Sequence, residues 1–373
     1  MTPTLRRSIP FFDYPHLFAA EEEMLVAIVR DVGRRGAFIL QQDLARFEES
    51  LARFLGARHA LGVGNATDGL IIALRASGIA AGDHVIFSSH TMIATAAAIH
   101  FAGAVPVPVE CGPDHLIDPQ AVSDAVTPRT RAILPTHLNG RTADMAALQR
   151  IADKNGLAVI EDAAQALGSR FRGQCAGTFG AAAAISFFPA KVLGCLGDGG
   201  AVVSNDDLVH DRMLQLHDHG RRPDGEIVSW GFNSRLDNLQ AAILDARLKN
   251  FAAVIERRRA IARLYRSRLH GLEELKLPPG PDGDAEHFDI YQNYEIEAMR
   301  RDGLQAHLKA GGIGTLVQWG GKAVHQWDKL GFTEKLPFTE KLFERMLLLP
   351  LNMSLSDDDV NVVCDAIYAF YRG

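Results

Sequence analysis

The sequence predicts an α/β protein with a mainly parallel central sheet flanked by helices, followed by a smaller α+β C-terminal domain. Two observations predict this fold class. Between about residues 57 and 205, short apolar runs recur between helical stretches, a spacing typical of βα units. Farther along, a long segment without glycine or proline leads into a loop rich in both, which indicates a second domain. The length of 373 residues also exceeds that of a usual single domain.

Six apolar runs are the candidate strands of the sheet. They are His84–Phe87, Val105–Val109, Ala132–Leu134, Leu157–Ile160, Ala183–Phe187 and Ala201–Ser204. Helices are expected at Asp68–Ala76, ahead of the first run, and at Ala143–Asn155, and Gly156 is placed to end the second one.

The second domain is expected to begin along a helical segment. Arg235–His270 has neither glycine nor proline, which predicts one long helix or two. The loop Leu277–Asp284 follows, and Ser356 can cap a final helix. We therefore predict a large domain over residues 1–245 and a small one over 246–373, with the N-terminal segment able to pack on the small domain.

Composition and charge exclude several classes of partner. With 47% hydrophobic residues, 23% charged residues and a net charge of −6, nucleic acid and anionic membranes are poor partners. Met1–Pro15 lacks the apolar core of a secretory signal, and histidine, glycine and proline interrupt the most apolar window, Thr91–Val109. The four cysteines have neither disulfide nor zinc-site spacing. We expect a cytoplasmic protein without a membrane segment or a metal.

A glycine-rich turn, Gly62–Leu70, runs directly into a helical pattern. Backbone N–H groups at a helix N-terminus attract phosphate, and Thr67 can add a hydroxyl donor. Neither GxGxxG nor a P-loop lysine is present, so a dinucleotide or nucleoside triphosphate site is not indicated. The alternative is that the turn is only a structural helix cap, which is what a Gly-Asn turn taken alone more often is.

Two carboxylates, Glu161 and Asp162, end a strand that is expected to be buried. Ligands of α/β sheets bind outside the carboxyl ends of the strands, so one of these acids could hold a cationic ring nitrogen. The alternative is that both acids cap a following helix.

A lysine, Lys191, closes the run that begins at Ser186 and precedes the glycine-rich segment Gly194–Gly200. A lone lysine is usually a solvated surface residue, but desolvation beside a cationic cofactor would lower its pKa and make it a nucleophile. Ser186 could donate to the same phosphate as the glycine-rich turn. A phosphate cradle, an acid and a Schiff-base lysine together are the contacts that pyridoxal 5′-phosphate needs.

With these motifs the sequence resembles the DegT-type (DegT/DnrJ/StrS) sugar aminotransferases, fold-type I pyridoxal phosphate enzymes that act on nucleotide-linked keto sugars. The resemblance covers about residues 9–372. Its most specific parts are Gly64–Asp68, Glu161–Gln165, Ser186–Lys191, Gly197–Gly200 and Asn233–Asp237.

The resemblance implies roles for individual residues. Lys191 resembles the lysine that forms the Schiff base, Asp162 the partner of the pyridine nitrogen, and Gln165 the contact near the ring 3-hydroxyl. Thr67 and Ser186 resemble phosphate ligands.

Further implied contacts involve the backbone amide of Ala66, beside that of Thr67, and Asn233, which resembles a phosphate ligand from the neighbouring subunit of a homodimer. Met92 stands where the family has an aromatic residue on the cofactor ring, and Leu167 where histidine is common. The segment 314–325 also departs from the commoner form; its candidate sugar contacts are Trp319, Lys322 and His325.

The expected reaction is transfer of an amino group, by resemblance from glutamate, to a nucleotide-linked keto sugar. Two alternatives stay open. One is a pyridoxal phosphate-dependent sugar dehydratase, although such relatives carry histidine in place of Lys191. The other is a non-enzymatic regulator that binds the cofactor on the same fold.

Overall fold

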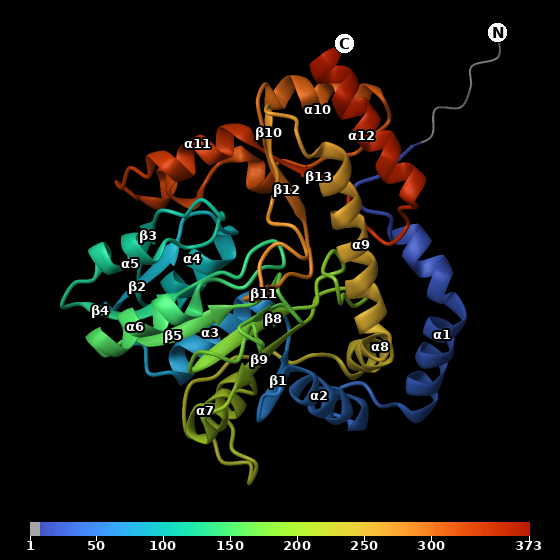
Figure 1. Ribbon diagram of the computed structural model, residues 1–373. Helices are drawn as coiled ribbons and strands as arrows, with labels where there is room; N and C mark the ends of the chain where they lie inside the picture. The colour runs from blue at the N-terminus through green and yellow to red at the C-terminus, as the bar shows by residue number, and fades with distance from the viewer. Residues whose placement is uncertain (1–7) are drawn as a thin grey trace.

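The computed structural model describes residues 8–373. The first seven residues of Met1–Pro15, the segment expected not to be a secretory signal, lie outside the described residues. A seven-stranded sheet forms the centre of the large part, in the order β1-β9-β8-β5-β4-β2-β3 (Figure 1). Its strands are β1 His59–Val63, β2 His84–Ser88, β3 Val105–Val109, β4 Thr130–Leu134, β5 Ala158–Asp162, β8 Ala182–Ser186 and β9 Gly200–Ser204. β9 runs opposite to the other six strands, which share one direction, so the predicted mainly parallel sheet is confirmed. All six expected strands are present, and β1 is an additional one.

Helices cover both faces of this sheet. On β2, Val85 and Phe87 pack with α3, α4 and α7, whereas the intervening Ile86 packs with α5 and α6 on the other face. A separate core lies between β9 and the helices α2 and α8. The bounds are α1 Tyr14–Arg35, α2 Gln42–Leu55, α3 Ala66–Ala76, α4 Ile93–Phe101, α5 Pro119–Ala125, α6 Met145–Asn155, α7 Asp207–His217 and α8 Asn238–Leu248. Alternate side chains of a buried strand therefore serve two different cores.

Local signals account for several helix boundaries. Asn65 caps α3 through a side-chain oxygen that accepts from Asp68 N, and Gly156, at φ 63°, ends α6. The segment 235–270 forms two helices, α8 and α9 (Phe251–Leu269), which confirms the second of the two expected arrangements.

The C-terminal part is built on a three-stranded antiparallel sheet of β10 (Leu275–Lys276), β12 (Tyr294–Ala298) and β13 (Met346–Leu349). The expected cap Ser356 starts the last helix. The helices here are α10 Arg301–Ala310, α11 Pro337–Arg345 and α12 Asp357–Arg372, with short 3₁₀ turns at Gln318–Gly321, Val324–Gln326 and Asp328–Leu330. Figure 1 shows this part at the top, above the large sheet.

The two parts are joined by more than the chain itself. Ile9 pairs with Ile313, which brings the N-terminal segment onto the small part. A second small sheet combines β6 (Arg170–Phe171) and β7 (Gln174–Cys175) with β11 (His287–Phe288) from beyond the proposed boundary. That boundary, at residue 245, falls inside α8, and the division into 1–245 and 246–373 stays a prediction.

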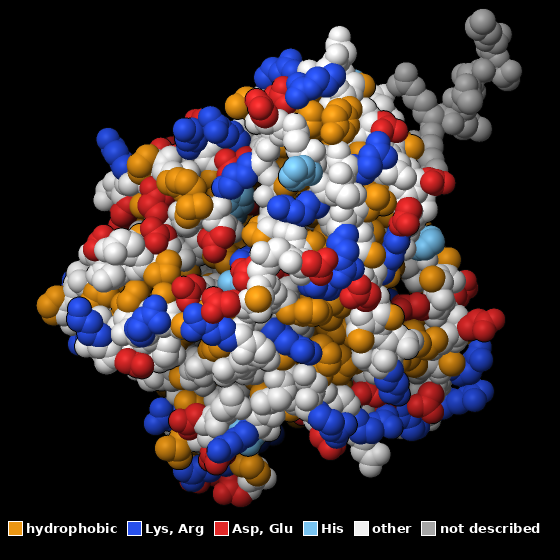
Figure 2. All heavy atoms as spheres, in the orientation of Figure 1, with side chains coloured by type: hydrophobic (Ala, Val, Ile, Leu, Met, Phe, Trp, Pro, Cys, Tyr) orange, Lys and Arg blue, Asp and Glu red, His pale blue; other side chains and the backbone are white. Residues whose placement is uncertain are grey.

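Among residues 8–373, none of the helices combines the length and the apolar composition needed to cross a bilayer. Figure 2 shows cationic and anionic side chains interspersed over the visible face, without a field of one sign. All four cysteines are buried and unpaired.

Candidate active site

The candidate site lies at one edge of the seven-stranded sheet. The parallel strands end at this edge, and β9 begins there because it runs in the opposite direction. Residues at these ends of β1, β2, β4, β5, β8 and β9 therefore converge on one place. They line a cavity of about 430 Å³, which the small part closes with Gln292, Asn293 and the segment around Gln318.

The N-terminus of α3 forms one wall of the cavity, through Ala66 and Thr67. The first helical hydrogen bond is from Gly69 N to Asn65 O, so the amides of Ala66 and Thr67 have no carbonyl partner within the helix. Gly200 packs against this turn so closely that a Cβ would lie 2.6 Å from the carbonyl carbon of Asn65. The turn is thus both a helix cap and an exposed pair of N–H donors, and Ser186, the last residue of β8, lines the same cavity.

Lys191 also lines the cavity. Burial lowers the pKa of its amine to about 8, and the nearby Asp162 carboxylate partly opposes that shift. A substantial share of the amine is therefore neutral near pH 8 and available as a nucleophile. Its backbone is held in a turn by the hydrogen bond from Lys191 N to Phe188 O.

The two adjacent acids have different surroundings. Asp162 reaches the cavity and accepts hydrogen bonds from Thr95 Oγ1 at 2.7 Å and Ala164 N at 3.1 Å. Glu161 points the other way, is fully buried, and accepts from three backbone amides of residues 177–180 and from His137 Nε2. No helix starts directly after β5, so the alternative that both acids cap a helix is wrong.

Three threonines around Asp162 were not foreseen from the sequence. Thr91 Oγ1 lies 2.9 Å from both Thr95 Oγ1 and Thr136 Oγ1, so the hydroxyls form a buried network beside the carboxylate. Thr91 and Thr136 follow the carboxyl ends of β2 and β4. The rule that ligands bind at the carboxyl ends of the strands is the signal that could have identified these two threonines from the sequence. Asn293, from the small part, has no comparable signal.

The structure brings most of the predicted site residues together. Those that line the cavity are Ala66, Thr67, Met92, Asp162, Gln165, Ser186, Lys191 and Trp319. Leu167 does not line the cavity and is buried in the core with α2, β9 and α8.

Three predicted residues do not line this cavity in the single chain. His325 is buried, with Nδ1 2.7 Å from Ser89 Oγ and Nε2 3.2 Å from Glu340. The Lys322 amine is 5.2 Å from the ring of Trp327, on the surface. Asn233 is exposed and pairs with Asp218. α8 begins only at Asn238, with Asp237 at its N-cap position, so Asn233 is not the cap of that helix.

Comparison with known proteins agrees with this arrangement. The profile of the DegT/DnrJ/EryC1/StrS aminotransferase family matches residues 19–368. The chain belongs to this family. It is 40% identical to a dTDP-3-amino-3,4,6-trideoxy-alpha-D-glucose transaminase of Streptomyces venezuelae, over 96% of this chain and 95% of that protein. It is 39% identical to a protein named pleiotropic regulatory protein from Geobacillus stearothermophilus, over 98% and 99% of the two chains.

The fold matches as well. The crystal structure of Streptomyces venezuelae DesV in complex with a ketimine intermediate superposes with a TM-score of 0.94 at 39% identity, over 98% of this chain and 99% of that one. The predicted family, fold class and aminotransferase activity are confirmed, and with them the cofactor of this family, pyridoxal phosphate.

The cavity residues fit this cofactor. Two free helix-terminal amides and two hydroxyls suit a phosphate, the Asp162 carboxylate suits a protonated ring nitrogen, and the Lys191 amine suits a carbonyl carbon. The half-exposed Met92 lies along the same cavity and can cover a ring face.

Proposed function

We propose that this protein transfers an amino group from glutamate to a ketone of a nucleotide-linked sugar. The observation that carries the proposal is the meeting of the Lys191 amine, the Asp162 carboxylate and the N-terminus of α3 in one cavity. The name of the Streptomyces venezuelae relative supports the sugar as acceptor. The four unpaired cysteines suit the cytoplasm as the compartment.

In this proposal each group has a defined task. Lys191 binds the cofactor. Its amine then moves a proton between the carbon of the amino donor and the cofactor carbon to which Lys191 was attached. Asp162 keeps a proton on the ring nitrogen, and Gln165 contacts the 3-hydroxyl oxygen. The amides of Ala66 and Thr67 bind the phosphate together with the Ser186 hydroxyl. When bound, the cofactor supplies an electron-withdrawing ring that stabilises negative charge at the reacting carbon.

The functional unit in this proposal is a homodimer. Asn233 is exposed at the end of a loop whose Trp230 is 94% exposed, and Ile227 and Val228 beside it are exposed as well. Apolar side chains gathered on a surface loop favour burial against another chain. A second copy that covers this loop would bring Asn233 to the phosphate of the neighbouring site.

The proposed sugar contact in the structure is Trp319, which lines the cavity. Lys322 and His325 were proposed with it, but the bonds of His325 to Ser89 and Glu340 support a structural role for that histidine.

Two other functions occur as alternatives on this fold. The presence of Lys191 argues against a dehydratase. The regulator has one observation in its favour, the name of the Geobacillus stearothermophilus relative. Turnover assays separate the three functions. An aminotransferase releases 2-oxoglutarate from glutamate and forms an amino sugar, whereas a dehydratase consumes the sugar without forming an amino sugar. A regulator turns over neither glutamate nor the sugar.

The decisive experiment has two steps. Borohydride reduction of the protein with bound pyridoxal phosphate, followed by peptide mapping, should place the label on Lys191. A panel of nucleotide-linked 3-keto and 4-keto sugars with glutamate should then yield an amino sugar, identified by mass and NMR. A label on another lysine, or no amino sugar from any member of the panel, contradicts the proposal.

A further inference from the structure

A row of amide side chains connects Gln165 with the small part of the protein. Gln165 Oε1 accepts from Asn139 N at 2.9 Å and from Asn293 Nδ2 at 3.3 Å. Because a backbone N–H is only a donor, the side-chain atom that faces it must be the carbonyl oxygen. The Gln165 NH₂ group is therefore the end that remains for the cavity, where Gln165 is a lining residue.

Asn139 has an unusual backbone that aims this N–H group. Its φ is 55°, in the left-handed region that asparagine tolerates better than most side chains, and Gly140 follows at φ 90°. A Cβ on Gly140 would lie 2.6 Å from the backbone nitrogens of Tyr291 and Gln292. The turn after β4 is thus pressed against the small part.

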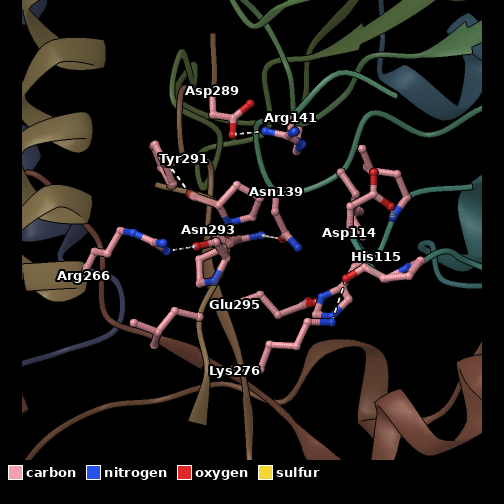
Figure 3. Close-up of a pocket in the computed structure, with 16 residues that line it drawn as sticks. Asp114, His115, Asn139, Arg141, Arg266, Lys276, Asp289, Tyr291, Asn293 and Glu295 are labelled. Atoms are coloured by element: carbon pink, nitrogen blue, oxygen red, sulfur yellow. Dashed lines mark hydrogen bonds and ion pairs between the residues drawn. The ribbon is translucent and has the colours of Figure 1, made fainter. Parts of the chain in front are cut away.

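The side chain of Asn139 fastens the same turn. Its Oδ1 accepts from Asn293 Nδ2 at 2.9 Å and from Gln318 Nε2 at 3.0 Å, both on the small part. Figure 3 shows Asn139 and Asn293 joined in this way at the wall of a second cavity, of about 380 Å³. Asn293 and Leu138 line both cavities, so this row of amides separates them.

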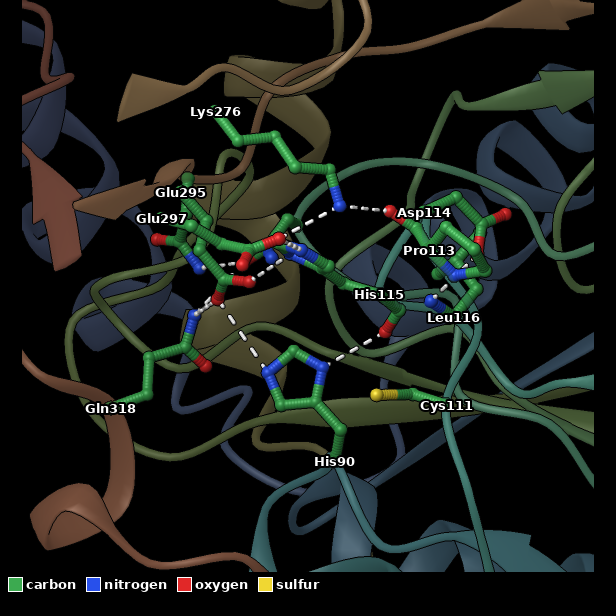
Figure 4. A network of polar contacts seen from close by, with 12 residues as sticks. His90, Cys111, Pro113, Asp114, His115, Leu116, Lys276, Glu295, Glu297 and Gln318 are labelled. Atoms are coloured by element: carbon green, nitrogen blue, oxygen red, sulfur yellow. Dashed lines mark hydrogen bonds and ion pairs between the residues drawn. The ribbon is translucent and has the colours of Figure 1, made fainter. Parts of the chain in front are cut away.

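The far end of the row is an ionic cluster. Gln318 Nε2 also donates to Glu295 Oε2 at 3.1 Å (Figure 4), so both of its hydrogens face acceptors, while its buried Oε1 has no partner among residues 8–373. Turning this amide over would set its oxygen against two acceptors. His115 lies between Glu295 and Glu297 with each ring nitrogen bonded to a carboxylate, which makes it a cation and keeps Glu295 anionic. The anionic Glu295 at this end of the row therefore determines which amide groups in the row donate and which accept.

We propose that Asn139 is a positioning residue for the cofactor: its N–H group holds the Gln165 oxygen so that the Gln165 NH₂ group donates to the 3-hydroxyl oxygen of the ring. The side chain of Asn139, anchored on Gln318 and Asn293, keeps the N–H group aimed. The inference rests on the proposed function, in which Gln165 contacts that oxygen.

The pH at which the bound cofactor changes its visible absorption reports this contact. A hydrogen-bond donor stabilises the ring oxyanion most after the nitrogen that links the cofactor to Lys191 has lost its proton. Loss of the donor therefore raises the pH at which the absorption changes. Asp162 and Asp198 are the other charged groups that line the cavity in the described residues, and none of the variants below alters them.

The test is a double-mutant cycle on the protein with bound pyridoxal phosphate and without an amino donor. Gln165→Met removes the donor and should raise the midpoint by about one pH unit, a tenfold change. Asn139→Gly keeps the backbone N–H and the positive φ but removes the anchor, and should raise it by about half a unit, roughly threefold. In the Gln165→Met background Asn139→Gly should have no further effect, because its only path to the ring is absent.

Three results would overturn the inference: an unshifted midpoint in Gln165→Met, an unshifted midpoint in Asn139→Gly, or equal shifts with and without Gln165. If Asn139→Gly does not fold, Gln318→Met, which removes the anchor from the other side, takes its place in the cycle. Asn238→Ala is the control, because it removes a buried amide that bonds Leu44 N and Ala37 O away from the site, and it should leave the midpoint unchanged. Failure of the proposed function looks different, since no nucleotide-linked keto sugar would then be converted to an amino sugar with glutamate, whatever the midpoints of the variants.

Discussion

Glu161 and Asp162 are neighbours on β5, and the alternation of a strand sends their side chains to opposite faces. Both carboxylate oxygens of Glu161 accept two hydrogen bonds each, from Gly177, Phe179, Gly180 and His137. Glu161 therefore holds the loop of residues 177–180 in place. Asp162 has hydroxyl and amide donors on one side and the cavity on the other. Of these two adjacent carboxylates, Glu161 therefore has a structural role and Asp162 faces the site of the chemistry.

We predict that isosteric amides separate these two roles. Asp162→Asn should lower turnover on the order of 100-fold or more, because an amide cannot hold the proton on the ring nitrogen, with little change in melting temperature. Glu161→Gln should lower the free energy of unfolding by about 2 kcal/mol or more, because an NH₂ group would face backbone N–H donors. Steady-state kinetics and thermal unfolding of both variants measure the contrast. Near wild-type turnover in Asp162→Asn would remove it from the chemistry.

At the scale of elements, α2 packs against β1 and brings one carboxylate into the contact. Glu48 Oε1 accepts from Gly62 N at 2.7 Å, and burial raises the pKa of Glu48 to about 7 although that hydrogen bond lowers it. A carboxyl with a raised folded pKa binds its proton more tightly in the folded chain. Its unfolded form ionises first, near its ordinary pKa of 4.5, so stability is lost as the pH rises from about 4.5 to about 7.

We predict that Glu48→Gln stabilises the protein in a pH-dependent way. The amide keeps the oxygen that accepts from Gly62 and has no charge to bury, so the gain should be roughly 1–3 kcal/mol at pH 8 and close to zero at pH 4.5. Chemical unfolding at both values measures it. Glu49→Gln is the matched control, since Glu49 is an exposed partner of Arg53 on the same helix and should change stability little at either pH. An equal gain at both pH values would contradict the assignment to Glu48 ionisation.

At the scale of the whole molecule, the cavity is assembled from both parts of one chain, but Asn233 lies outside it. The homodimer proposed here supplies this residue from the second chain. We predict that mixing inactive Lys191→Ala and Asn233→Ala chains restores activity, because a mixed dimer has one site with both residues intact. Random pairing should give about a quarter of the wild-type activity.

The matched control for this experiment mixes Lys191→Ala with Asp162→Asn chains. Both of those residues line the same cavity of one chain, so every site in a mixed dimer keeps one defect and activity should not return. If subunits exchange and the first mixture also stays inactive, Asn233 is not shared between subunits.

The sequence by itself determined the elements whose signals are local. Short apolar runs located six of the seven main strands, and Asn65, Gly156 and Ser356 mark helix ends through bonds within a few residues. Lys191 was recognised because its motif is contiguous. In each case the interaction that decides the structure lies within one turn or one strand.

Only the tertiary structure decided which side chains meet across the fold. The order of the strands brings Thr95 to Asp162, and the small part brings Asn293 to Gln165, over separations of 67 and 128 residues. The same packing turned His325 inward, toward Ser89. These contacts depend on how distant elements cross, and no local pattern of residues specifies that geometry, because a side chain's direction is set by the element that carries it and its partners by the elements packed against it.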